Sequence, residues 1–283
     1  MKLYKIESGN LKLDGGAMFG VVPKVLWNKL YPADENNLCN WAMRCLLIET
    51  NGKLILIDTG MGDKQPDKFF KHYYPNGDNS LLSSLKKNGF SPEDITDVLI
   101  THLHFDHVGG AVKKDKDGKL SPAFPNAIYH ISKGQWDWAM DANRREKASF
   151  LPENYMPLQE HKVLNLVEEE TELFPNVFVK MFDGHTNAQM LPFIKYKGQT
   201  IVYGADLFPS TAHIPMPYIM GYDTRPLGTL EDKKRFFKEA VPNDYILFFE
   251  HDLYNECCSL QDTEKGVKVK DTFSLQEFTN SFN

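Results

Sequence analysis

The stretch that most constrains this chain is Thr101–His107, which reads THLHFDH and holds three histidines and one aspartate within six residues. Imidazole and carboxylate groups together suit zinc or iron better than metals that prefer thiolates. The apolar run Val98–Ile100 leads directly into it, which predicts a buried strand whose C-terminal end delivers the ligands. Because His102 and His104 alternate, an extended segment would point both the same way.

Three later apolar runs predict strands that also end in residues able to bind a metal. Functional groups collect beyond the C-terminal ends of strands in sheets with helical crossovers, so we expect these residues to join the first cluster. The strands are expected over 177–182, 200–203 and 245–249, and they lead to His185, Asp206 and His251. The predicted metal ligands are therefore His102, His104, Asp106, His107, His185, Asp206 and His251.

These ligands divide into two sets, which predicts two divalent metal ions. His102, His104 and His185 would hold one ion. Asp106, His107 and His251 would hold the other, with Asp206 bridging both. Two ions about 3.5–4 Å apart share a hydroxide, and metal binding brings the pKa of water down to about 7. The predicted chemistry is attack of that hydroxide on a carbonyl or phosphoryl centre, with Asp106 as a catalytic residue that also passes a proton.

Composition and charge exclude several classes of partner. The chain has 283 residues, a formal net charge of −6 and a pI of about 5.9, so no general field draws it to nucleic acid or to an anionic membrane. The first residues lack the apolar core of a signal peptide, and no apolar run approaches a membrane span. The four cysteines have no zinc-knuckle spacing, which favours a reduced, cytoplasmic setting. A small-molecule substrate is expected.

Alternating helix and strand patterns predict a layered α/β protein with a single domain over 1–283. Asn51-Gly52 between two apolar runs predicts a hairpin, and Ser80–Asn88 predicts a helix. A glycine-rich N-terminal loop over 14–40 is either a connector packed by Phe19 and Trp27 or a wall of the substrate pocket. An insertion over about 132–160 is expected to cover the active site, either as a hydrophobic lid or by packing alone.

Large side chains around the expected mouth of the site favour a partly apolar substrate. The predicted substrate contacts are Phe19, Trp27, Trp136 and Phe208. His213 lies seven residues beyond Asp206, which makes it a candidate for catalysis or substrate contact. Asp58 ends an earlier apolar run before Gly60, where it either supports a ligand or only forms a turn.

The order of these motifs resembles the metallo-β-lactamase superfamily. His102-x-His104-x-Asp106-His107 is followed by Gly184-His185-Thr186, Gly204-Ala205-Asp206 and His251, and the match runs from about 45 to 252. Asp58 matches the early acidic motif of that superfamily. The resemblance implies a four-layer αβ/βα sandwich and a dinuclear zinc hydrolase, with iron or manganese as the other metals such sites accept.

Within the superfamily, three segments look similar to acyl-homoserine-lactone lactonases and methyl-parathion-type hydrolases. They are the loop from Gly16 to Trp27, the segment Asp206–Pro209, and His213. Two departures stand out. Many relatives continue Gly-His-Thr with Pro-Gly-His where this chain has 187–189 as Asn-Ala-Gln, and Pro209 takes the place of a lactonase tyrosine that touches substrate.

The leading hypothesis is a dinuclear metallohydrolase that cleaves a small ester, lactone or phosphotriester. Three alternatives stay open within the same fold: a mononuclear iron dioxygenase of the persulfide type, a phosphodiesterase or RNA-processing nuclease, and a binding protein without activity. A nuclease needs basic surface to hold phosphates, and no long Lys/Arg run is present. The loop 14–40 and the insertion 132–160 are candidate homodimer surfaces.

Overall fold

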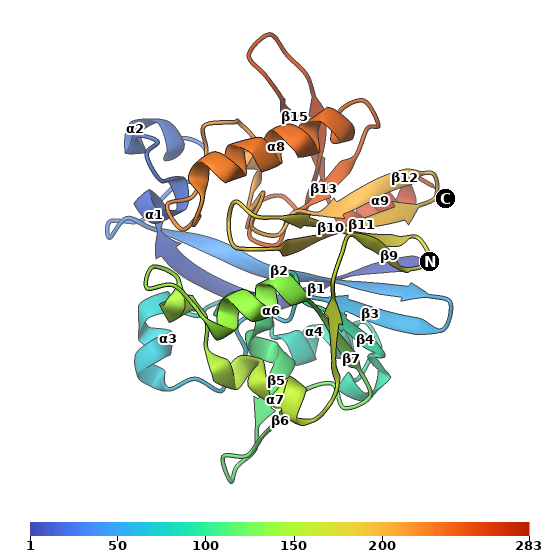
Figure 1. Ribbon diagram of the computed structural model, residues 1–283. Helices are drawn as coiled ribbons and strands as arrows, with labels where there is room; N and C mark the ends of the chain where they lie inside the picture. The colour runs from blue at the N-terminus through green and yellow to red at the C-terminus, as the bar shows by residue number, and fades with distance from the viewer. Residues whose placement is uncertain (283) are drawn as a thin grey trace. The chain divides into compact units, whose positions relative to one another are not determined.

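The computed structural model describes residues 1–282, and these residues divide into two units. Unit 1 comprises Met1–Leu11 and Ala42–Glu169, and unit 2 comprises Lys12–Trp41 and Glu170–Asn283. Strands β1 and β2 run across the boundary, so each unit contains one end of both (Figure 1). Each unit is described by itself.

The main sheet of unit 1 has six strands in the order β1-β2-β3-β4-β7-β8. The expected Asn51-Gly52 hairpin joins β2 to β3, and both turn residues have positive φ. From β3 to β8 neighbouring strands are parallel, which brings their C-terminal ends to one edge. The bounds are β1 (Lys2–Asp14), β2 (Leu38–Thr50), β3 (Lys53–Ile57), β4 (Asp97–Leu99), β7 (Ile128–Ser132) and β8 (Leu164–Val167), with a separate hairpin of β5 (Val112–Lys114) and β6 (Leu120–Pro122).

Short helices connect these strands. The helix predicted over 80–88 is present, with Ser80 capping its first turn. Ser132 likewise caps the helix that opens the insertion, since its hydroxyl accepts from the Gln135 amide. The helices of unit 1 are α3 (Asp67–Tyr73), α4 (Leu81–Lys87), α5 (Phe105–Val108), α6 (Lys133–Met140) and α7 (Met156–Glu160), with 3-10 turns η1 (Pro92–Asp94), η2 (Gly109–Ala111), η3 (Lys147–Ser149) and η4 (Pro152–Asn154).

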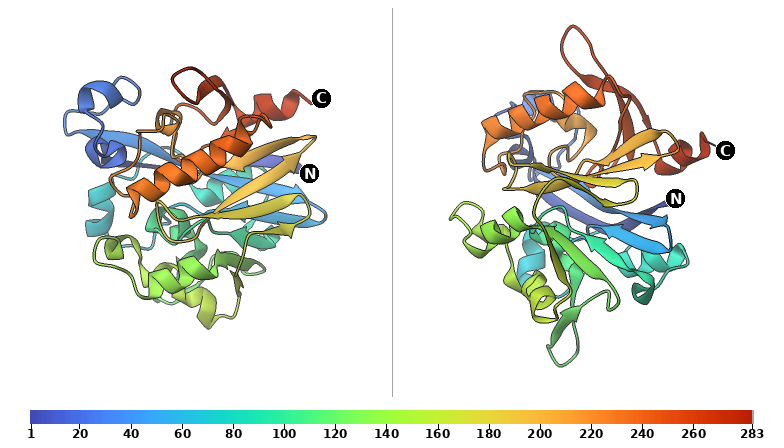
Figure 2. Two further views of the ribbon diagram at one scale, coloured as in Figure 1. Left: turned by 45° about the horizontal axis from the view of Figure 1, so that its top comes forward. Right: turned by 45° about the vertical axis from the view of Figure 1, so that its right-hand side comes forward.

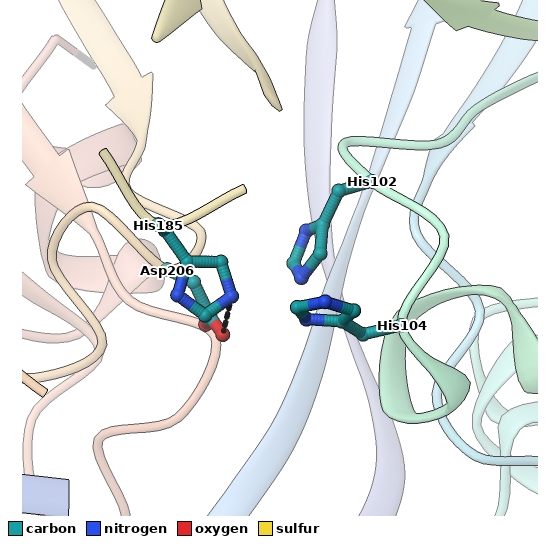
Figure 3. A group of neighbouring side chains, drawn as sticks. All are labelled: His102, His104, His185 and Asp206. Atoms are coloured by element: carbon teal, nitrogen blue, oxygen red, sulfur yellow. Dashed lines mark ion pairs between the residues drawn. The ribbon is translucent and has the colours of Figure 1, made fainter. Parts of the chain in front are cut away.

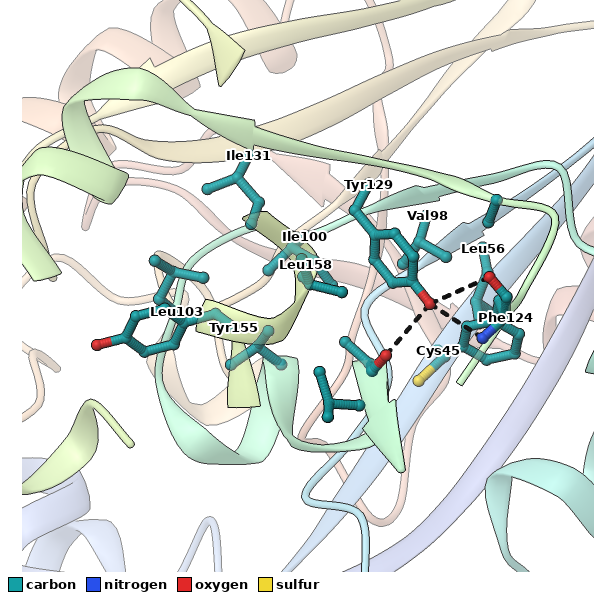
Figure 4. Packing of buried hydrophobic residues seen from close by; sticks show 14 of the residues in the cluster. Cys45, Leu56, Val98, Ile100, Leu103, Phe124, Tyr129, Ile131, Tyr155 and Leu158 are labelled. Atoms are coloured by element: carbon teal, nitrogen blue, oxygen red, sulfur yellow. Dashed lines mark hydrogen bonds between the residues drawn. The ribbon is translucent and has the colours of Figure 1, made fainter. Parts of the chain in front are cut away.

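The core of unit 1 lies between this sheet and its helices (Figure 4). Leu85 of α4, Trp136 of α6 and Leu158 of α7 belong to the same buried cluster as strand residues such as Leu56 and Val98. Tyr129 crosses this core, and its hydroxyl donates to the Ala111 carbonyl at 3.2 Å and accepts from the Phe124 amide at 3.0 Å. Burial of this apolar surface holds the ends of β3 and β4 in register.

A buried polar network fixes the opposite, N-terminal edge of the parallel strands. Asp97 of β4 accepts from Lys53 at 2.7 Å and from the Thr96 hydroxyl at 2.7 Å, and it lies 3.0 Å from His130 Nε2. Asn165 contacts the other ring nitrogen of His130 at 2.9 Å. Burial alone raises the pKa of Asp97, but the bonds from His130, Lys53 and Thr96 outweigh it and lower the pKa to about 2.

We expect Asp97→Asn to destabilise the chain by roughly 2 kcal/mol at pH 6, the value of a shift from 3.8 to about 2. A carboxylate with a depressed folded pKa stabilises fully above its unfolded pKa, and this contribution is lost as pH falls from about 4 to 2. Urea unfolding at pH 6 and pH 3 measures both effects, and the variant should show a weaker acid dependence than the wild type. Asp137→Asn, which removes an exposed Lys133 pair, is the control and should change stability by less than about 0.5 kcal/mol.

The sheet of unit 2 has seven strands in the order β15-β14-β13-β12-β11-β10-β9. Only β12 and β13 are parallel neighbours within this sheet, and β10 shares their direction because two antiparallel steps separate it from β12. The C-terminal ends of β10, β12 and β13 therefore meet at one edge. The bounds are β9 (Thr171–Phe174), β10 (Val177–Phe182), β11 (Gln189–Tyr196), β12 (Gln199–Tyr203), β13 (Ile246–Phe248), β14 (Cys257–Gln261) and β15 (Lys268–Phe273).

Helix α8 packs along this sheet (Figure 2). Its Phe236 contacts Phe193 of β11, with ring centroids 6.1 Å apart, and also contacts Phe208. The other helical segments of unit 2 are α1 (Gly15–Phe19), α2 (Lys24–Trp27), α9 (Leu275–Asn280) and the 3-10 turn η5 (Thr211–His213), alongside α8 (Pro226–Ala240). Across residues 1–282, the structure contains no helix with the length and apolar character needed to cross a membrane.

Candidate metal centre

The first cluster of predicted ligands lies in unit 1, directly after β4. His102 and His104 occupy the loop between β4 and α5, and Asp106 and His107 lie on α5 itself. The His102 ring centroid is 4.5 Å from that of His104 and 3.9 Å from that of His107 (Figure 3 shows the first two). All four side chains are buried. The sequence pattern and the parallel sheet together therefore concentrate four metal-competent groups at one strand end.

Asp58 and Thr101 hold two of these rings in a defined orientation. Asp58 follows β3, and its carboxylate accepts from the amide and the hydroxyl of Thr101, each at 2.7 Å. The same carboxylate lies 3.1 Å from Nδ1 of His107. Because the Thr101 hydroxyl proton goes to Asp58, its oxygen accepts from Nδ1 of His102 at 3.0 Å. Both rings are thus protonated at Nδ1 and carry their lone pair on Nε2, the form in which imidazole binds a metal.

Glu146 orients His104, and sequence reasoning did not find it. Its Oε1 lies 2.9 Å from Nε2 of His104, and both side chains are buried. Glu146 lies in the insertion predicted over 132–160, 42 residues along the chain, in a stretch with no periodic pattern. His104 therefore differs from His102 and His107, because the carboxylate that orients its ring faces Nε2.

Close backbone packing fixes the far end of α5. The carbonyl of His107 accepts from the amide and the hydroxyl of Thr59, each at 2.8 Å. Beyond it, the carbonyl of Gly109 accepts from the buried ammonium of Lys64. A Cβ atom added to Gly109 would lie 2.0 Å from the carbonyl oxygen of Met61, so only glycine fits there. The segment between β3 and α3 thus holds α5, and with it Asp106 and His107, in place.

The second cluster lies in unit 2, where three strands end at one edge. His185 follows β10, Asp206 follows β12 and His251 follows β13. The two carboxylate oxygens of Asp206 each face a different ring, at 3.1 Å from Nε2 of His185 and 3.1 Å from Nε2 of His251. Figure 3 shows the first of these pairs as a dashed line. A short carboxylate placed between two imidazoles is a set of donors that a divalent metal ion can bind.

Asp223 supports this cluster and was also missed from the sequence. It lies 2.9 Å from Nδ1 of His185 and accepts from the Thr229 hydroxyl at 2.7 Å. Burial lowers the pKa of His185, but the charges and hydrogen bonds of Asp206 and Asp223 outweigh it and raise the pKa to about 10. A cation at Nε2 of His185 would replace that proton and keep the same carboxylate partners.

His213 is buried near this cluster in the loop after β12, with both ring nitrogens engaged. Nδ1 lies 2.8 Å from the Ser210 hydroxyl, and Nε2 lies 2.8 Å from the Met18 carbonyl. Its ring stacks on Phe19 at 4.6 Å between centroids. Burial lowers its pKa to about 3, so the ring is neutral near pH 7. These contacts tie the loop to α1, and a direct catalytic role for His213 stays a prediction.

Lys233 secures the same loop from α8. It is fully buried, and its ammonium donates to the carbonyls of His213, Pro215 and Tyr218 at 2.6, 2.9 and 3.3 Å. Burial lowers its pKa to about 7. One side chain thus satisfies three carbonyls at the end of η5 and in the chain that follows it, a function that the spacing of residues in α8 did not indicate.

The four aromatic residues predicted to touch substrate are buried within their own units. Phe19 stacks on Trp27 at 5.0 Å between centroids. Phe208 packs against α8, and the rings of Trp136 and Tyr155 have centroids 5.7 Å apart. At most 5% of any of the four is exposed, so in this conformation each one packs a core. Their role in substrate binding stays a prediction.

The donor chemistry of both clusters fits divalent metal ions. Four histidines have a ring nitrogen that faces a carboxylate or hydroxyl of the same unit, an arrangement that suits metal binding through the other ring nitrogen. These pairs are His102 with Thr101, His104 with Glu146, His107 with Asp58, and His185 with Asp223. Orientation of imidazole by a carboxylate is the usual support for a zinc-binding histidine.

Comparison with known proteins agrees with this chemistry. The chain is 25% identical over 281 residues to an N-acyl homoserine lactonase of Bacillus cereus, covering 95% of this chain and 96% of that one. A solved structure of a probable metal-dependent hydrolase from Staphylococcus aureus has a TM-score of 0.87 and 30% identity, covering 96% of both chains. The dizinc quorum-quenching lactonase AidC has the same fold, with a TM-score of 0.78, 24% identity, and coverage of 96% of this chain and 94% of that one.

The family model of the metallo-β-lactamase superfamily matches residues 44–251, a range that begins in β2 and ends at His251. This range includes every predicted metal ligand. The predicted α/β fold class of the metallo-β-lactamase type, and the resemblance to its lactonase-like branch, are confirmed. The chain belongs to the metallo-β-lactamase superfamily.

Proposed function

We propose that this protein is a metal-dependent hydrolase that cleaves a small, partly apolar ester, with lactones as the first substrate class to test. One observation carries the proposal: each unit presents a buried group of histidine and aspartate side chains at its strand ends, with the rings oriented by polar neighbours. The full-length similarity to N-acyl homoserine lactonases supports the choice of lactones.

In this proposal the ligands divide as the sequence predicted, and the cofactors are two zinc ions. His102, His104 and His185 would hold one ion. Asp106, His107 and His251 would hold the other, and Asp206 would be a ligand shared by both. The contact of Asp206 with two imidazoles in unit 2 supports its bridging role. The imidazole and carboxylate donors support zinc over metals that select thiolates.

Bound metal ions at such a site supply a hydroxide nucleophile at neutral pH and polarise the oxygen of the electrophile. The protein contributes orientation. Asp58 and Glu146 hold ligands of unit 1, and Asp223 holds His185. Asp106 lies 3.8 Å from Nε2 of His107, and we assign it the transfer of a proton toward the leaving group.

We expect the substrate to be a small, partly apolar molecule. The net charge of −6 supports neither nucleic acid nor an anionic membrane as a partner. Pro209 offers no hydroxyl where one lactonase type has a tyrosine, so contacts to a lactone carbonyl would have to come from other groups. Esters and phosphotriesters therefore stay in the proposed substrate range. A cytoplasmic setting and a homodimer are part of the same proposal.

The test is a hydrolase screen on protein whose metal content has been measured. We expect about two zinc ions per chain and the highest kcat/KM on lactones among lactones, aryl esters, phosphotriesters and β-lactams. One iron per chain with oxygen-dependent turnover of a persulfide would replace this proposal with the dioxygenase. Salt-sensitive RNA binding with phosphodiester cleavage would replace it with the nuclease.

A further inference from the structure

Glu146 lies in the middle of a buried hydrogen-bond network. One carboxylate oxygen, Oε1, faces Nε2 of His104 at 2.9 Å. The other, Oε2, accepts from Nε1 of Trp138 at 2.6 Å and from the side-chain amide of Asn143 at 3.1 Å. The Glu146 side chain is 3% exposed, so water contributes little to its solvation. The two oxygens therefore differ in these partners, and Oε1 is the oxygen that faces His104.

The turn that carries Glu146 is itself fixed. The Asn143 side-chain oxygen accepts from the amide of Arg145 at 3.0 Å and from the amide of Glu146 at 3.1 Å. The Asn143 carbonyl accepts from the amide of Lys147 at 2.9 Å. This turn and Trp138 of α6 leave the carboxylate little freedom to swing away from His104.

We propose that Glu146 is a positioning residue that selects the metal-binding tautomer of His104. A carboxylate only accepts, so it takes the proton on Nε2 and places the lone pair of His104 on Nδ1. Thr101 and Asp58 do the reverse for His102 and His107, where the proton lies on Nδ1. The insertion 132–160 thereby acts on the metal site through His104, whether or not it also covers substrate. This inference rests on the proposed function, because it takes His104 to be a ligand.

Glu146→Gln tests this proposal directly. Glutamine has nearly the same shape as glutamate, but its NH2 group donates a hydrogen bond where a carboxylate oxygen accepts one. Trp138 and Asn143 both donate to Oε2, so the amide oxygen of the glutamine must stay on that side. Its NH2 group then faces His104 and donates to Nε2, which moves the histidine proton to Nδ1. We expect zinc affinity, measured by competition with a chromophoric chelator, to fall about 10- to 100-fold.

The matched control is Glu160→Gln, which removes the same charge from an exposed position on α7 in the same insertion. It should bind zinc as the wild type does. Circular dichroism and thermal melting check that both variants fold. If folded Glu146→Gln binds zinc as tightly as the control, or if its His104 keeps the proton on Nε2, the inference is wrong.

The wild-type protein provides a second measurement that does not depend on the variant folding. Long-range 15N–1H spectra of histidine-labelled, zinc-loaded protein report which ring nitrogen carries the proton. We expect His104 protonated at Nε2 and His102 and His107 protonated at Nδ1. A His104 protonated at Nδ1 would overturn the inference. Unchanged zinc binding in His104→Ala would instead overturn the proposed metal site, so the two failures are distinguishable.

Discussion

His104→Ala and Asp206→Ala are each expected to lose most of the bound metal and to lower kcat/KM for hydrolysis roughly 1,000-fold or more. Each substitution removes a proposed ligand, and a metal ion supplies several kcal/mol of transition-state stabilisation at such sites. The substitutions test the two clusters separately, because His104 lies in unit 1 and Asp206 lies in unit 2. Metal content by mass spectrometry and steady-state kinetics on the best substrate of the screen measure both effects.

His161→Ala serves as the control, since His161 is exposed and lies outside both clusters. It should keep wild-type metal content and turnover. Melting curves should show all three variants folded. Full turnover by metal-free His104→Ala protein would contradict the proposed mechanism, and full metal content in Asp206→Ala would contradict its role as a shared ligand.

Gly109→Ala is expected to destabilise the chain by about 3 kcal/mol, the upper end of the usual cost of overpacking. The added Cβ would meet the Met61 carbonyl oxygen at 2.0 Å and its carbon at 2.4 Å, and backbone atoms cannot rotate away as a side chain can. Gly109 follows His107 by two residues, so the forced shift should also displace α5 and weaken metal binding. Urea unfolding and chelator competition measure the two effects.

Gly118→Ala is the matched control because open space surrounds Gly118, and its φ of +84° is the only obstacle to a side chain. It should cost about 1 kcal/mol and leave metal binding unchanged. Equal stability losses in the two variants would show that the contact between Gly109 and Met61 does not constrain α5.

Local patterns predicted the strands and turns of this chain well. The Asn51-Gly52 hairpin, the Ser80 helix cap and the strand over 177–182 are all present, because each depends on residues adjacent in sequence. The predicted ligands follow strand ends within each unit for a related reason. A strand end is a local feature, and parallel strands bring their C-terminal ends to the same edge of a sheet.

The aromatic residues show the limit of that reasoning. Phe19 and Phe208 lie in glycine- and proline-rich segments, a context that equally suits a pocket wall and a packed connector. The structure buries both, with Phe19 against Trp27 and Phe208 against α8. Whether such a residue lines a pocket or packs a connector depends on the residues that long-range packing places beside it. The local composition does not specify those residues.

The sequence by itself determined the family, the strands that lead to each motif and the candidate metal ligands, because each depends on residues that lie close together in the sequence. Only the tertiary structure decided which groups orient those ligands. Glu146 reaches His104 across 42 residues and Asp223 reaches His185 across 38. A hydrogen bond between residues that are distant in sequence depends on where two atoms lie in space, and it produces no periodic pattern in the sequence. These partners of the histidines can therefore be identified only from the tertiary structure.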